Sequence, residues 1–124
     1  MEIKRALTLV GSFVLLAATL RAADISGKWK GQFQGGDSTR ELAFDFKAAG
    51  ENLTGGVTGL RDKVLEIKDG KVQGDTVTFW VMSEWQGEPV KLVFKGQVSG
   101  SEIRFTMGTE DGGWSTEVTA KRIS

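Results

Sequence analysis

Three reactive residue types are missing from this chain of 124 residues, which contains no cysteine, no histidine and no tyrosine. Without cysteine there is neither a disulfide nor a thiol nucleophile. Without histidine the commonest general base and the imidazole ligand of metal ions are absent. A metal site would have to use oxygen ligands only, as Ca²⁺ and Mg²⁺ sites do. We therefore expect a protein without enzymatic activity, without a cofactor and without a bound metal.

Proline is also scarce, with one residue, whereas glycine is abundant, with 17. The sequence KVQGDTVTF at 71–79 recurs as QVSGSEIRF at 97–105, and 46–53 is a looser copy. Each copy has the pattern of a strand, a two-residue turn that begins with glycine, and a second strand. Glycine supplies the positive φ that such turns need. The repeat predicts a meander of antiparallel strands.

The N-terminus has the order of a secretory signal peptide over residues 1–22. A basic segment at 1–5 precedes an apolar segment at 6–18, and Ala22 offers a small residue for cleavage. An uncleaved anchor is the alternative, although the apolar run is short for a membrane span. We expect an exported protein, periplasmic or secreted, with one domain at 23–124. The slightly acidic mature domain is poorly suited to nucleic acid and, once the signal is removed, to membranes.

Alternating apolar and polar residues predict eight strands, at 25–34, 39–48, 52–58, 63–73, 76–83, 89–99, 102–109 and 114–123. Small and large residues alternate on the inner faces, which suits a small closed barrel. The predicted fold is therefore all-β, an eight-stranded antiparallel up-and-down meander barrel. The strand at 63–73 carries one residue more than its repeat partner, which predicts a β-bulge near Asp69.

The two ends of this barrel are expected to differ. The turns at Gly50, Gly74 and Gly100 fall at one end, together with both chain termini. Four longer loops, at 35–38, 59–62, 83–88 and 109–113, fall at the other end, which we call the open end. Ligand sites favour the mouths of β-barrels. The sequence therefore predicts that binding takes place at the open end.

A G-x-W motif at the start of the first strand ends in Trp29, and Arg122 lies near the end of the last strand. This pairing resembles the lipocalin, fatty-acid-binding and avidin superfamily of up-and-down barrels. The resemblance implies structural roles, in which Trp29 closes the barrel base and Arg122 packs over its ring. Residues 50–59 also look like the second hairpin of avidin-type barrels. The residues that would bind biotin have no clear counterparts, so biotin is not expected.

The mature chain is also similar to a short domain of exported proteins from soil bacteria. It begins with DISGKW at 24–29, repeats the glycine hairpin and ends with AKR at 120–122. The resemblance implies an accessory to secreted carbohydrate-active enzymes, without an assigned activity.

Two tryptophans, Trp85 and Trp114, are expected at the open end. Exposed tryptophan rings stack on the apolar faces of sugars, while polar neighbours bind hydroxyl groups. The polar residues expected beside them are Glu84, Gln86, Arg61 and Asp111. The alternative is that the two rings plug the barrel, because side chains alone can fill an eight-stranded interior.

Trp80 and Met82 are expected to face outwards, since their neighbours face the core. An outward tryptophan beside a methionine forms an apolar patch, which suits a partner protein or a dimer contact as well as a ligand. Glu84 and Glu110 lie on loops and do not predict the rigid carboxylate pair of a glycosidase.

The leading hypothesis is therefore a non-catalytic exported binding domain that contacts a carbohydrate or small molecule at the open end. The alternative is a protein-binding barrel, such as an inhibitor of, or accessory to, a secreted hydrolase. A third hypothesis is a purely structural companion of an enzyme.

Overall fold

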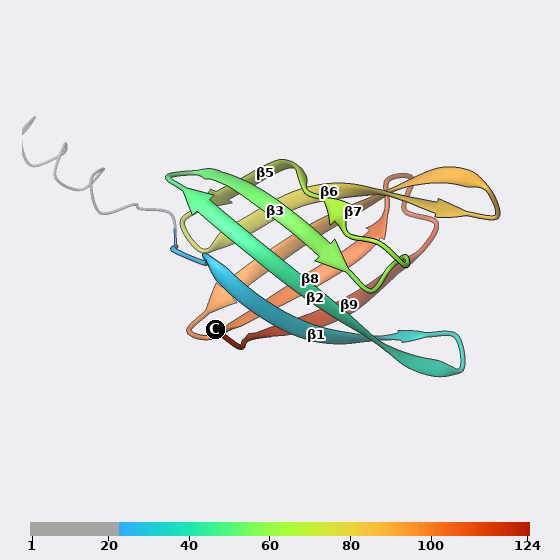
Figure 1. Ribbon diagram of the computed structural model, residues 1–124, viewed down its shortest axis with the longest axis horizontal. Helices are drawn as coiled ribbons and strands as arrows, with labels where there is room; N and C mark the ends of the chain where they lie inside the picture. The colour runs from blue at the N-terminus through green and yellow to red at the C-terminus, as the bar shows by residue number, and fades with distance from the viewer. Residues whose placement is uncertain (1–22) are drawn as a thin grey trace, which may run out of the picture.

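The computed structural model describes residues 23–124, and the expected signal peptide at 1–22 lies outside the described residues. Figure 1 shows one antiparallel sheet closed on itself. Its strands are β1 Gly27–Gly35, β2 Ser38–Ala49, β3 Asn52–Thr58, β4 Leu65–Glu66, β5 Lys68–Gln73, β6 Thr76–Trp85, β7 Glu88–Ser99, β8 Glu102–Thr109 and β9 Ser115–Arg122. Within 23–124, no helix is long and apolar enough to cross a membrane.

The strands follow the order of a closed meander. Neighbours are hydrogen-bonded in the order β2-β1-β9-β8-β7-β6-β5-β3-β4, and β2 also pairs with β3, which closes the sheet. The short strands β4 and β5 follow each other along one edge of β3, so together they form a single member of the barrel. The predicted eight-stranded antiparallel meander barrel is therefore confirmed.

The predicted bulge lies in β5. Between the pairs Lys68–Trp80 and Lys71–Thr78, β5 advances three residues while β6 advances two. The extra residue on β5 lies next to Asp69, whose φ is 49°. A bulge of this kind leaves one residue unpaired and strengthens the local twist. The predicted β-bulge near Asp69 is confirmed, although the expected strand at 63–73 begins only at Leu65 and is interrupted between β4 and β5.

Two of the four loops predicted at the open end are tight turns instead. Gly35 pairs with Ser38, and Trp85 pairs with Glu88, so only two residues connect each pair of strands. In the β6–β7 turn both central residues have positive φ, 51° at Gln86 and 83° at Gly87. This is the type I′ geometry, whose twist matches that of a hairpin. The strands therefore continue, and both hairpins project past the barrel (Figure 1).

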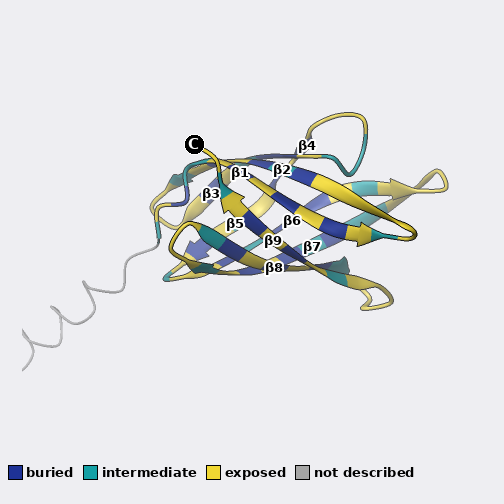
Figure 2. Ribbon diagram, turned by 90° about the horizontal axis from the view of Figure 1, so that it is seen from below, coloured by how far each residue is buried: buried dark blue, intermediate teal, exposed yellow. Residues whose placement is uncertain are grey.

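The core follows from the alternation along each strand. Buried and exposed residues alternate along the strands in Figure 2, as the period of two predicts. Among residues 23–124, every buried residue is apolar or glycine. In the same range, each buried side-chain nitrogen or oxygen has a hydrogen-bond partner. Burial of these apolar side chains supplies the main driving force for folding.

The base of the barrel is organised around Trp29, which is fully buried. Its indole Nε1–H donates a hydrogen bond of 2.9 Å to the carbonyl of Ile25. Arg122 lies opposite Trp29 in the β1–β9 ladder, with its guanidinium carbon 4.6 Å from the ring centroid. The guanidinium also donates to the carbonyls of Ser26 and Asp24, at 2.7 and 3.1 Å. Trp29 and Arg122 therefore join the segment before β1 to the last strand.

Replacing Trp29 by alanine should lower the free energy of unfolding by about 3–5 kcal/mol, the usual range for a buried tryptophan. The matched control is Trp85→Ala, which removes an equal side chain from a site that is 70% exposed. That variant should stay within about 0.5 kcal/mol of the parent. Urea unfolding followed by circular dichroism measures both values. Equal losses in the two variants would contradict the assignment of Trp29 to the core.

Candidate functional site

The middle of the barrel is filled by aromatic side chains. Neighbouring rings have centroids 4.6–6.4 Å apart in stacked, tilted and edge-on pairs. A Cβ on Gly96 would meet the ring of Phe105 at 2.6 Å, so this glycine makes room for the cluster. The rings belong to Phe44, Phe46, Phe79, Phe94 and Phe105. Any ligand would therefore have to bind at the outer surface or the rim of the barrel, because the rings fill the interior.

Trp85 and Gln86 lie at the tip of the projecting β6–β7 hairpin. Trp85 is the last residue of β6 rather than part of a loop, and its side chain is 70% exposed. Gln86 occupies the first position of the turn. By strand parity Trp85 belongs to the inward face, but the hairpin has already passed the end of the barrel, so the ring does not plug the interior.

Arg61 and Glu84 are partners of each other. Their side chains form a salt bridge of 2.9 Å, and each is about one-third to two-fifths exposed, at 34% and 41%. The pair ties the loop between β3 and β4 to the β6–β7 hairpin. An exposed pair of this kind adds little stability. The salt bridge connects the hairpin to the loop. It also leaves each of the two charges with a partner of opposite sign.

Asp111 organises the loop between β8 and β9. Its Oδ1 accepts hydrogen bonds from the Gly113 N–H at 2.9 Å and the Thr109 hydroxyl at 2.8 Å. These bonds, the Gly113 amide first, lower the pKa of Asp111. The hydroxyl of Thr109 also accepts from the Trp114 N–H at 3.1 Å. Asp111 therefore fixes the position from which Trp114 projects.

Trp114 packs edge-on against Phe33, with ring centroids 6.4 Å apart and an interplanar angle of 73°. Trp114 remains 43% exposed, whereas Phe33 is almost fully buried. The contact joins the loop before β9 to β1, the strand that β9 has to meet to close the barrel. Trp114 thus lies on the rim, where part of its ring is available to a ligand.

The outward patch of Trp80 and Met82 is held by polar groups. The Trp80 indole donates to Asp69 at 2.8 Å, so the bulge in β5 positions its acceptor. The ammonium of Lys91 lies 4.6 Å from the Trp80 ring centroid and also pairs with Glu110 at 2.9 Å. Met82 is 45% exposed. Trp80 is therefore largely engaged by its own neighbours, and Met82 is the freer member of the patch.

None of the six residues expected to bind ligand at the open end lines either of two clefts that the structure describes. Both clefts instead follow the junction of β1 and β9. The β1–β9 ladder extends only from Trp29, opposite Arg122, to Gln32, opposite Thr119. β1 continues to Gly35 with β2 as its partner, while β9 has begun at Ser115 with β8 as its partner.

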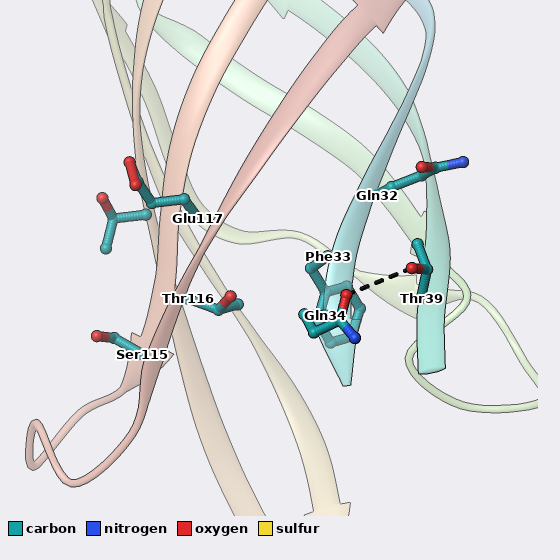
Figure 3. A pocket seen from close by; sticks show the side chains of 8 residues that line it. Gln32, Phe33, Gln34, Thr39, Ser115, Thr116 and Glu117 are labelled. Carbon is teal, nitrogen blue, oxygen red and sulfur yellow. Dashed lines mark hydrogen bonds between the residues drawn. The ribbon is translucent and has the colours of Figure 1, made fainter. Parts of the chain in front are cut away.

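The first strand and the last strand therefore separate towards the open end, and the space between them is a cleft of about 630 Å³, which we call the seam cleft. Figure 3 shows its two walls and the hydrogen bond of 3.4 Å between Thr39 and Gln34. Glu117 is the sole charged residue among those that line the seam cleft. Its lining residues are Gln32, Phe33, Gln34, Thr39, Thr106, Ser115, Thr116 and Glu117.

The register also shows which backbone groups face the seam cleft. Along an antiparallel strand, residues alternate between bonding to one neighbour and to the other. Lys28 bonds towards β9, because its carbonyl accepts from the Ile123 N–H at 2.8 Å. Gln34 has the same parity, but the β1–β9 pairing has ended at Gln32. Within the described residues, the register therefore leaves the N–H and C=O of Gln34 without a strand partner on that side.

The same argument applies to β9. The Thr109 N–H donates to the carbonyl of Trp114 at 2.9 Å, so residues of even number bond to β8. Residues of odd number point towards β1. Thr119 meets Gln32 there, whereas Ser115 and Glu117 lie beyond the ladder. Within 23–124, each wall of the seam cleft thus presents strand edges that the barrel itself does not pair.

Sequence reasoning missed these residues, because polar residues that alternate with apolar ones along a strand give the ordinary pattern of a solvent-facing row. The first and last strands are far apart in the chain, and no turn between them sets their register. The polar stretch Ser115–Thr116–Glu117 was a weak signal at most. Among residues 23–124, no group of three or more acidic side chains is placed to hold a metal ion. No family model, curated protein or solved structure matches the chain.

The loop interaction of Asp111 predicts a pH dependence. Because the folded-state pKa lies below the ordinary value, the loop hydrogen bonds are present above that ordinary value and are lost as the pH falls through the lowered pKa. The Gly113 amide signal in NMR spectra should titrate with a midpoint below that of an unperturbed aspartate. Thr109→Val removes one donor and should raise the midpoint. An ordinary midpoint in the parent would contradict the loop geometry.

Proposed function

We propose that the chain is a non-catalytic exported binding domain that holds an extended segment of a partner protein in the seam cleft. The observation that carries this proposal is the end of the β1–β9 ladder at Gln32 and Thr119 while both strands continue. Unpaired strand edges are templates for another strand. Peptides bind such edges through main-chain hydrogen bonds, while side chains on either face add specificity.

The surroundings of the seam cleft support this mode of binding. The aromatic cluster occupies the middle of the barrel, so an external site is the one that the fold leaves available. The β1 wall belongs to the projecting β1–β2 hairpin, which the Gly35–Ser38 pairing keeps in strand form. The β9 wall is held by β8 and by the Asp111 loop. The edges are therefore preorganised, which reduces the entropic cost of binding.

The partner class remains the one that the sequence suggests, a secreted hydrolase to which the barrel acts as accessory or inhibitor. The surface proposed for the contact changes, from the Trp80–Met82 patch to the seam cleft. The Asp69 hydrogen bond and the Lys91 ammonium already occupy much of the Trp80 side chain.

A carbohydrate is the second candidate ligand, and a specific observation favours it. The half-exposed ring of Trp114 contacts Phe33, a residue of the seam cleft, beside amide and hydroxyl side chains. A sugar would be bound mainly by these side chains, whereas a polypeptide would be bound mainly by backbone groups. The two candidates therefore respond differently to mutation.

Gln34→Pro separates the two candidates. Proline removes the N–H that faces the seam cleft, and at an unpaired edge this costs the barrel no ladder hydrogen bond. Gln34→Ala keeps that N–H and removes the side chain. The probe is the synthetic hexapeptide Ala-Thr-Val-Thr-Val-Thr, followed by the amide signals of Gln34, Ser115 and Glu117 in ¹⁵N NMR titrations. We expect the peptide to shift all three signals in the parent, and those of Ser115 and Glu117 in Gln34→Ala.

Gln34→Pro should weaken peptide binding at least about fivefold, equivalent to roughly one hydrogen bond. Glu117→Pro tests the opposite wall in the same way, should the first variant fail to give a dispersed spectrum. A parent whose cleft signals respond to xylohexaose or cellohexaose, and not to the peptide, would overturn the protein-binding proposal in favour of the carbohydrate. Equal binding by the proline and alanine variants would overturn recognition through the edge.

A further inference from the structure

We infer that the seam cleft receives the N-terminal end of the partner chain, with the α-ammonium group against Glu117. This inference rests on the proposed function, because it specifies which part of a polypeptide enters the cleft. Three observations carry it: the shape of the cleft, the position of Glu117 and the charges around it.

The seam cleft is shallow and open to solvent along its outer side, and along the direction of the strands it is closed at one end. It begins between the β1–β2 hairpin and the start of β9, and it stops where Gln32 pairs with Thr119. A segment that adds to either edge from the open end meets this closed ladder after a few residues. An uninterrupted strand would have to turn out of the barrel wall there, whereas a chain terminus can stop. The shape therefore favours a chain end.

Glu117 lies next to the closed end. The last pair of the ladder is Gln32–Thr119, and continuing that register by two residues places Glu117 opposite Gln34. Figure 3 shows Glu117 and Gln34 on the two walls of the cleft. The Glu117 side chain extends from β9 away from Gln34 (Figure 3), so a chain terminus at the closed end meets a backbone carbonyl directly and the carboxylate once the Glu117 side chain turns towards β1. Both groups accept hydrogen bonds, and an ammonium group has three N–H donors to offer.

The charges select the amino end over the carboxyl end. Glu117 is the sole charged residue lining the seam cleft, so a terminal carboxylate would meet a like charge and no lining cation. Three cations in the surroundings have other partners. Arg40 donates to the Gly59 carbonyl, and Lys30 pairs with Glu41 at 3.7 Å. Arg104, on the neighbouring strand β8, pairs with Glu102 at 3.5 Å.

The neighbouring cleft is consistent with this polarity. It shares Gln32 and Glu117 with the seam cleft and continues along the outside of β1 and β9, past the closed end. Lys30 and Lys121 face each other within the ladder, and both line that second cleft together with Glu41. Lys30 is paired with Glu41, which lines the same cleft, so Lys121 is the lysine whose charge opposes the advance of an ammonium group past Glu117. The charge pattern marks one stopping point.

The test compares three versions of the hexapeptide Ala-Thr-Val-Thr-Val-Thr in ¹⁵N NMR titrations of the barrel. The first has a free amino group and an amidated carboxyl end. The second is acetylated and amidated, and the third is acetylated with a free carboxyl end. We expect the first to bind about two- to fivefold more tightly than the second, as for a partly exposed ion pair. The third should bind no better than the second.

Glu117→Gln keeps the backbone edge and removes the charge, so it should make the free and acetylated peptides equal in affinity. The control is Glu88→Gln, which removes an exposed carboxylate from the start of β7 and should leave the preference unchanged. Equal binding of all three peptides by the parent would overturn this inference while the proposed function stands. Preference for the free carboxyl end would also overturn it. Absence of binding by every peptide would overturn both proposals.

Discussion

Closure between the first and last strands is the constraint on which this structure depends. No turn connects β1 to β9, so their pairing has to be secured by side chains. Trp29 and Arg122 do this at the base, where the cation lies on the ring and the guanidinium binds the backbone before β1. Further along, Phe33 and Trp114 touch across the same junction. Between these contacts the hydrogen-bonded ladder ends at Gln32 and Thr119, and the seam cleft is what remains of the junction.

The filled interior and the open junction both follow from the small size of the domain. A domain of this length can pack one core, and here aromatic rings from β2, β6, β7 and β8 occupy it. Those rings hold their own strands together. On β1 the large inward residues Trp29 and Phe33 are separated by Gly31, and β9 contributes the small Ala120 opposite it. The barrel is therefore firm where the phenylalanines meet and less completely paired at the junction. The proposed ligand site accordingly lies on the wall of the barrel rather than inside it.

The architecture was predictable because its signals are local. The glycine turns, the alternation and the extra residue near Asp69 act over a few residues, and each of these predictions is confirmed. The end of a ladder between strands ninety or so residues apart has no such local signal. The loop predicted at 83–88 is a two-residue turn, because Gln86 adopts a positive φ. A positive φ is uncommon for glutamine, so no pattern in the sequence predicts this turn. Trp85 consequently extends a strand, and the expected cluster at the open end is divided among separate contacts.

Two of the polar residues expected to bind a ligand already have partners within the barrel. Glu84 is paired with Arg61, and Asp111 is bonded within its own loop, so a ligand would have to displace an existing partner of either residue. The edges at Gln34 and Glu117 have no strand partner to displace within the described chain. Since a buried or covered backbone group without a hydrogen bond is costly, an occupant that pairs with these edges replaces water at little penalty. We therefore place the proposed site where surface groups have no partner, rather than where their chemical type alone suggests binding.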